Sequence, residues 1–169
     1  MDGRQGLEKF LQDRKPALLE AWFQTILESY PAETRPFLVK KEDTFTNPIG
    51  STIYEALAEL LAELIQDKNL GNIKKPLDDL IHLRAVQDFS PSQAISFLPH
   101  LKQLIRKELM AADLMESYQE EFHKLAFLID ELTMQAFDIY MGCREKIFNL
   151  KVKELRKIVK LESEMSLKS

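Results

Sequence analysis

Apolar residues recur at intervals of three and four along most of the chain, the spacing that places side chains on one face of an α-helix. The first such stripe contains Leu7, Phe10, Leu11, Leu18, Trp22, Ile26 and Tyr30. Pro16 falls inside the stripe, so it either begins a second helix or kinks a single one. Because the residue before a proline avoids the helical region, the stripe is predicted to end at Tyr30-Pro31.

The segment 31–46 has no helical period and is predicted to be a loop with one short turn near Phe37. Asn47 is a favourable N-cap and Pro48 a favourable first helical residue, so a second helix is expected to start there. Gly50 in its first turn indicates close approach by another helix or by a ligand. The free N–H groups of this turn would suit an anion.

Two more helices are predicted before residue 111. Gly71 and Asn72 are expected to end the helix that starts at Pro48, and Pro76–Phe89 is expected to form the next. Ser90, Pro91 and Gln93 then form the pattern of a capping box with proline at the first helical position. Pro99 lies inside the helix that follows and predicts a kink, because the Ile95 carbonyl loses its partner.

The last apolar register is the longest, and it runs from Phe122 to Val159 without a proline. A helix of about 40 residues would be roughly 60 Å long and would extend beyond a domain of this size. Near its end Val152, Leu155 and Val159 have the spacing of a coiled-coil seam. The basic residues around that seam fit a solvated flank, a docking face for an acidic partner, or contact with an anionic membrane surface.

Together these patterns predict an all-α fold: one helical-bundle domain of about five to six helices, with a long C-terminal helix that projects from the body. We expect residues 1–150 to form the helical domain itself. Residues 151–169 are expected to form a projecting basic helix end and a disordered tail. The 169 residues suffice for one ordinary hydrophobic core.

Composition narrows the setting of the protein. The net charge of −4 argues against a general nucleic-acid binder, because such affinity comes from neutralising phosphates. No apolar run is long enough for a membrane span, and the charged N-terminus does not look like a signal peptide. The single Cys143 fits a reducing compartment. We therefore expect a cytoplasmic protein.

Catalytic patterns are missing from the sequence. No nucleophile–base pair and no metal-ligand spacing is evident, so neither an enzyme nor a metal site is expected. Cys143 is either a redox-sensitive thiol beside Arg144 or a small residue at a helix interface. Arg84 falls on or beside an apolar face and should need a carboxylate or an anionic ligand. His82 is either a satisfied, partly exposed histidine or a haem or metal ligand.

Four stretches together resemble the N-terminal domain of RsbRD-type proteins, the RsbT co-antagonist regulators of stressosome signalling. They are WFQTILESYP (22–31), FTNPIGSTI (45–53), LIHLRAVQDFSPSQAISFLPHLKQLIRKEL (80–109) and YMGCREKIFNLKVKEL (140–155). The resemblance covers roughly residues 7–158. It implies an all-helical, non-enzymatic input domain that passes a signal along a connecting helix to an output module. The chain stops soon after this region, so we expect a stand-alone member that signals through a partner.

Two functional hypotheses follow. The first is a signalling input or adaptor domain that works as a homodimer and contacts an unidentified protein partner. Its candidate dimer or partner helix carries Phe148, Val152, Leu155 and Val159. The alternative is a small-molecule or haem sensor, with candidate ligand or anion contacts at Asn47, Gly50, His82 and Arg84. No cofactor is predicted under the first hypothesis, and haem belongs only to the alternative.

Overall fold

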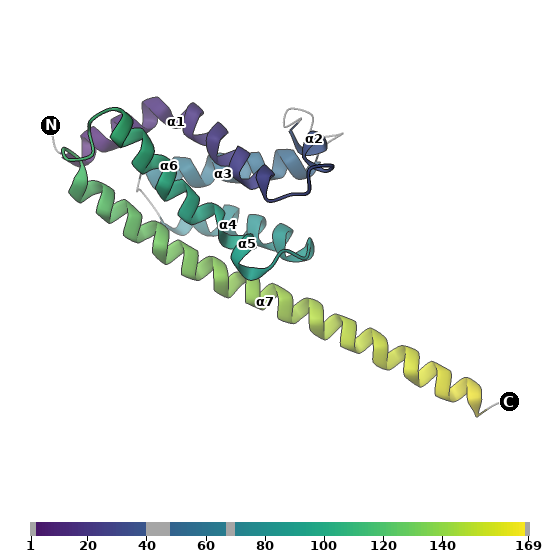
Figure 1. Ribbon diagram of the computed structural model, residues 1–169. Helices are drawn as coiled ribbons and strands as arrows, with labels where there is room; N and C mark the ends of the chain where they lie inside the picture. The colour runs from purple at the N-terminus through teal and green to yellow at the C-terminus, as the bar shows by residue number, and fades with distance from the viewer. Residues whose placement is uncertain (1–2, 40–47, 67–69, 168–169) are drawn as a thin grey trace.

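The computed structural model describes residues 3–39, 48–66 and 70–167, and every regular element in these ranges is a helix. Figure 1 shows the helices packed side by side, with the last one running along the bundle and far beyond it. Of the helices in these described ranges, five are long and two are short. They are α1 (Gly3–Glu28), α2 (Arg35–Leu38), α3 (Pro48–Gln66), α4 (Leu70–Val86), α5 (Pro91–Ile95), α6 (Phe97–Ala111) and α7 (Gln119–Ser166). The predicted all-α bundle with a projecting last helix is confirmed.

The five long helices form a closed ring in which each packs on two neighbours, in the order α1, α3, α4, α7, α6 and back to α1. The apolar stripes found in the sequence face the centre of this ring. Trp22 in α1 and Leu60 in α3 are fully buried, as are Leu80 in α4 and Leu101 in α6. The Trp22 indole N–H also donates to the Phe97 carbonyl over 2.6 Å, which joins α1 to the start of α6.

Pro16 and Pro76 lie inside α1 and α4, respectively. α1 continues through Pro16 as one helix, so Pro16 does not begin a second one. The predicted end at Gly71-Asn72 and the predicted start at Pro76 are wrong, because α4 already begins at Leu70 and contains Pro76. Ile73 and Leu77 are both buried, so packing of this turn outweighs the unfavourable glycine and proline.

Other predicted boundaries agree with the structure. α2 places a short turn at Phe37, and α3 begins at Pro48. Ser90 caps α5 with a complete capping box to Gln93. The helix interruption expected from Pro99 lies at Ser96, between α5 and α6.

The last helix is longer than the sequence indicated. α7 has 48 residues and continues to Ser166. Its body-facing side carries Ile129, Leu132, Ala136 and Tyr140, all buried. From Phe148 to Leu167 every side chain is exposed except the half-buried Val152. The end of α7 therefore projects from the bundle, as Figure 1 shows.

Candidate functional site

Arg84 is the largest charged side chain in the core, with 1% of its surface exposed. It lies on α4 and reaches the last turn of α5, where Nε donates to the Ala94 carbonyl over 3.0 Å. Nη2 donates to the Gln93 carbonyl and to the Ser29 hydroxyl, each over 2.9 Å. Arg84 thus joins the end of α1, α4 and α5 through one planar group.

Aromatic rings complete the surroundings of this guanidinium. Its carbon lies 4.1 Å from the ring centre of Phe89 and 5.7 Å from that of Tyr30. Burial lowers the Arg84 pKa and raises the Tyr30 pKa, because both charged forms lose water. Nη1 is buried without a hydrogen-bond partner. No described carboxylate pairs with Arg84, so carbonyl oxygens and ring faces stand where a salt bridge or anionic ligand was predicted.

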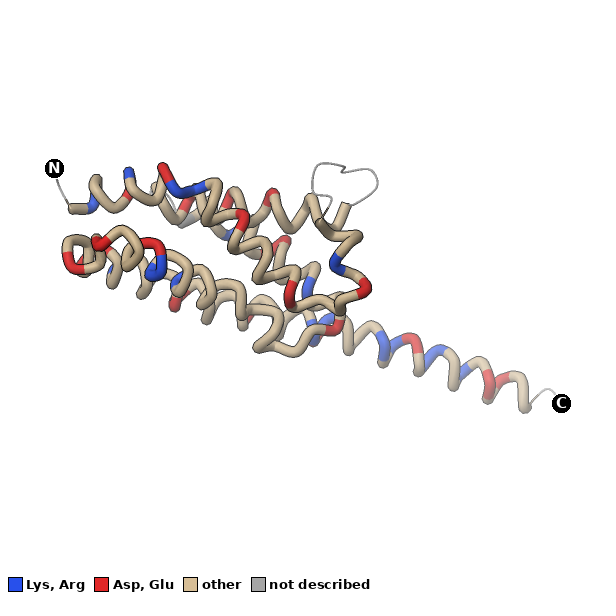
Figure 2. Tube along the Cα trace, turned by 45° about the horizontal axis from the view of Figure 1, so that its top comes forward, with Lys and Arg blue, Asp and Glu red and all other residues tan. Residues whose placement is uncertain are grey.

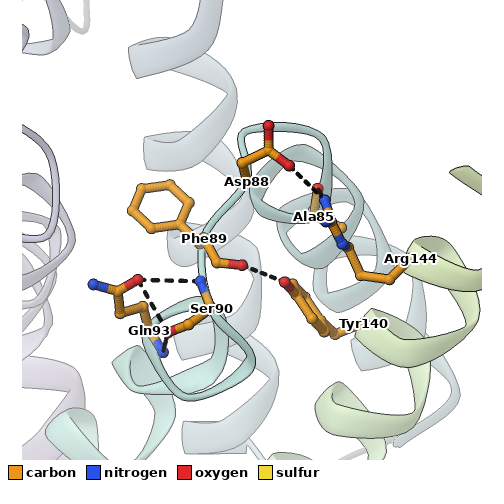
Figure 3. A network of polar contacts seen from close by, with 7 residues as sticks. All are labelled: Ala85, Asp88, Phe89, Ser90, Gln93, Tyr140 and Arg144. Atoms are coloured by element: carbon orange, nitrogen blue, oxygen red, sulfur yellow. Dashed lines mark hydrogen bonds and ion pairs between the residues drawn. The ribbon is translucent and has the colours of Figure 1, made fainter. Parts of the chain in front are cut away.

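The turn between α4 and α5 is held from the other side by α7. Figure 3 shows the Tyr140 hydroxyl donating to the Phe89 carbonyl and Arg144 reaching back to the end of α4. Nη1 of Arg144 donates to the Ala85 carbonyl over 3.1 Å and to the Asp88 carboxylate over 2.7 Å. The turn is therefore anchored to α7 close to the point where α7 leaves the bundle.

Asp88 is the residue that reverses the chain after α4. It has a φ of 60°, in the left-handed region, which aspartate tolerates better than most side chains. The Arg144 guanidinium, by its hydrogen bond first and its charge second, lowers the pKa of the exposed Asp88 carboxyl. Arg144 thus stabilises the left-handed backbone conformation of Asp88, just after the end of α4.

The ligand contacts predicted from the sequence do not come together. Asn47 lies outside the described residues. Gly50 is buried in the first turn of α3. His82 is exposed on α4, with Nδ1 2.7 Å from the Asp78 carbonyl oxygen, whereas Arg84 points into the core. His82 and Arg84 therefore do not line one pocket.

Cys143 is buried on the body-facing side of α7, with 7% exposed. Burial raises the pKa of its thiol, which lowers the thiolate fraction at neutral pH. Of the two alternatives, the structure favours the small residue at a helix interface.

The candidate dimer or partner residues lie on the projecting part of α7. Phe148, Leu155 and Val159 are 65%, 61% and 63% exposed, and Val152 is half-buried. A shallow groove along this helix is lined by Val152, Leu155, Arg156, Val159, Lys160 and Ser163. Within the described residues, these apolar side chains therefore form an exposed stripe on the projecting part of α7.

Sequence reasoning did not find four residues of the network: Tyr30, Asp88, Tyr140 and Arg144. Tyr140 appeared only as one of the apolar positions of α7, and its hydroxyl gave no separate signal. Asp88 follows the last apolar residue of its helix, and that position could have suggested a left-handed turn. Arg144 lies four residues after Tyr140 and so shares its face, which could have indicated a paired anchor.

The described ranges contain no group of three or more His, Cys, Asp or Glu side chains arranged to hold a metal ion. In the same ranges, no helix is both long enough and apolar enough to cross a lipid bilayer.

The family model described as RsbT co-antagonist protein rsbRD N-terminal domain matches residues 16–154. An uncharacterised protein of Archaeoglobus fulgidus is 27% identical over 143 residues, which cover 84% of this chain and 84% of that protein. No solved structure matches the chain significantly.

Proposed function

Because the chain belongs to the family of RsbT co-antagonist protein rsbRD N-terminal domains, a stressosome-type signalling family, we propose that it is a non-enzymatic input or adaptor domain. It acts through protein–protein contacts in the cytoplasm. Its working form is a homodimer built on the projecting half of α7, and a further protein partner receives the signal.

One observation carries this proposal: the apolar register of α7 continues past the body of the bundle. Phe148, Leu155 and Val159 are each more than 60% exposed, and Phe148 and Leu155 continue, at intervals of seven, a row that begins beside the bundle with the exposed Met141. An isolated helical segment of this length is marginal in water. Pairing with a second helix would bury these side chains and stabilise the projecting segment.

The contacts that α7 makes near the point where it leaves the bundle support a signalling role. Tyr140 and Arg144 on α7 bind the turn that Arg84 holds from inside the bundle. A change in the packing of the bundle core would therefore reach α7 through hydrogen-bonded neighbours. The projecting segment would then present the change to a partner.

The proposal is tested by ending the chain after Phe148 and measuring its mass in solution by light scattering and native mass spectrometry. We expect the full chain to be a dimer and the shortened chain to be a folded monomer. Near-ultraviolet circular dichroism checks that the bundle around Trp22 is intact. An unchanged oligomeric state after truncation would contradict the dimer.

A small-molecule sensor is the second candidate, and the buried Nη1 of Arg84 favours it by lacking a partner. Gently purified protein would then carry added mass in native mass spectrometry, and Arg84→Lys would remove it. A haem version predicts a Soret band that disappears in His82→Ala. Protein with neither added mass nor a Soret band would contradict this candidate.

A further inference from the structure

The exposed side of α7 carries an apolar stripe that is much longer than its projecting end. Phe127, Met134, Met141, Phe148 and Leu155 follow one another at intervals of seven, and we call them the outer stripe. They are exposed by 65%, 71%, 46%, 65% and 61%, respectively. On the part of α7 that packs on the bundle, they lie opposite the buried row that contains Leu132 and Ala136.

Each heptad of a coiled coil has a second seam position besides the one that the outer stripe occupies. In α7 the residues at this second position change from acidic to apolar along the helix. Four residues after the members of the outer stripe come Glu131, Asp138, Glu145, Val152 and Val159. The first three are exposed carboxylates beside the bundle, whereas the last two are apolar and lie on the projecting half. The outer stripe is therefore bordered by an acidic row along its first half only.

The projecting half has the opposite charge. From residue 146 to its end at Ser166 it carries six basic residues, Lys146, Lys151, Lys153, Arg156, Lys157 and Lys160, against three acidic ones, Glu154, Glu162 and Glu164. Figure 2 shows basic positions with acidic ones between them along the helix that leaves the bundle. The two halves of α7 are therefore electrostatically complementary to each other.

We infer that the occupant of the outer stripe is the α7 helix of a second copy of this chain, packed antiparallel. This inference rests on the homodimer proposed above and specifies its geometry. In a parallel pair, Glu131, Asp138 and Glu145 would each face the same residue of the partner, and like charges in a seam repel. Only the short segment 148–159 would then pair well.

An antiparallel pair places the acidic half of each helix along the basic half of the other. Heptad packing then places Phe127 beside the partner's Val159 and Met134 beside the partner's Val152, with the two-fold axis near residue 143. Most of the outer stripe is then buried against the partner's helix. The buried surface is larger than the projecting ends alone would supply.

A hollow in the bundle lies where the partner's helix end would arrive. Its volume is about 420 Å³, and it opens between α1, α3 and α7. Its lining is apolar, with Leu7, Leu11, Leu64, Leu125, Phe127 and Leu128. Its rim includes three carboxylates, Glu8, Glu121 and Glu131, and two cations, Arg4 and Lys124. A basic helix end with apolar side chains fits such a rim and lining.

The test measures distances between two spin labels in the full-length dimer by pulsed electron paramagnetic resonance. Labels are attached in a Cys143→Ala background, at Asn149→Cys in one sample and at Lys157→Cys in another. Both sites are exposed and lie off the outer stripe. In an antiparallel pair the two Asn149 labels are separated by roughly 18 Å along the axis and the two Lys157 labels by roughly 42 Å.

A short distance at Asn149 together with a distance of roughly 45 Å at Lys157 is the expected result. Short distances at both sites would overturn the antiparallel geometry and leave the homodimer standing. No dipolar signal at either site would overturn the homodimer and, with it, this inference.

Removing the acidic charges is an independent test, because it should weaken an antiparallel dimer and strengthen a parallel one. Replacing Glu131→Gln, Asp138→Asn and Glu145→Gln removes attraction from an antiparallel pair and repulsion from a parallel one. We expect the dimer dissociation constant to rise about tenfold, since the dimer loses six exposed carboxylates, three from each chain, that lie along the partner's basic half. The control removes the same charge from exposed positions away from α7, with Glu33→Gln, Glu55→Gln and Glu59→Gln. A tighter dimer in the first variant would contradict the antiparallel arrangement.

Discussion

The guanidinium of Arg84 stabilises three chain segments without a described carboxylate, and its shape explains how. Its acceptors include the last carbonyls of the five-residue helix α5, which no helical N–H can satisfy. A planar fork can serve these acceptors together and still lie over the ring of Phe89, which an ammonium group cannot do.

Arg84→Lys and Arg84→Ala test this role. We expect Arg84→Ala to lower the free energy of unfolding by about 2–4 kcal/mol, because it leaves a cavity and removes the hydrogen bonds that Arg84 donates to the Gln93 and Ala94 carbonyls. Arg84→Lys should also be destabilising, since lysine keeps the charge but loses the fork. Urea unfolding measures both. A lysine variant as stable as the original chain would contradict a role for guanidinium geometry.

Asp88 offers a pH-dependent test at the same scale. Its pKa is lowered in the folded state by Arg144, so this ion pair stabilises the fold above the ordinary aspartate pKa, near 3.9. The stabilisation is lost as the pH falls through the lower, folded pKa. Asn also tolerates the left-handed region, so Asp88→Asn removes the charge and keeps the turn.

We therefore expect Asp88→Asn to be less stable than the original chain at pH 6. The difference should shrink as the pH falls below 4. Urea midpoints measured across this range would show it. A difference that stays constant with pH would mean that the ion pair with Arg144 contributes nothing.

At the scale of the element, α7 combines two environments in one helix. Its first half has a buried face that contains Ile129 and Tyr140, whereas the side chains from Phe148 to Leu167 are exposed except for the half-buried Val152. Gly142 lies near the boundary. A Cβ added there would meet no atom within 4 Å, so nothing in the bundle requires glycine at this position.

Gly142→Ala should therefore stabilise the protein. Alanine loses less backbone entropy on folding than glycine, and the gain expected in a helix interior is about 0.5–1 kcal/mol. Thermal or urea unfolding would measure it. A loss of stability would indicate that another chain approaches Gly142 closely in the assembled protein.

At the scale of the whole molecule, the core of the bundle followed from the sequence because its stripes are long and regular. The start of α4 did not, because burial of Ile73 and Leu77 outweighs the local preferences of Gly71 and Pro76. The carbonyl partners of Arg84 could not be predicted either. They depend on how α5 packs across α4, and no spacing along the chain encodes that contact.

The oligomeric state also affects the whole molecule. If pairing stabilises the projecting half of α7, then dilution into monomers should fray it. We expect far-ultraviolet circular dichroism to lose helical signal on dilution, while the near-ultraviolet signal of the buried Trp22 stays constant. The chain ending after Phe148 is the matched control, because its helicity should not depend on concentration.

Because α7 runs without interruption from the bundle into its projecting half, the orientation of that half depends on the number of residues in the helix before it. Each residue turns an α-helix by about 100°. The number of residues between Arg144 and Phe148 therefore fixes the direction in which the projecting part of the outer stripe, Phe148 and Leu155, faces relative to the bundle. One alanine inserted there would swing the far half about a third of a turn, whereas seven would nearly restore its direction. The length of this short stretch therefore determines the rotation of the projecting half about the axis of α7, relative to the bundle.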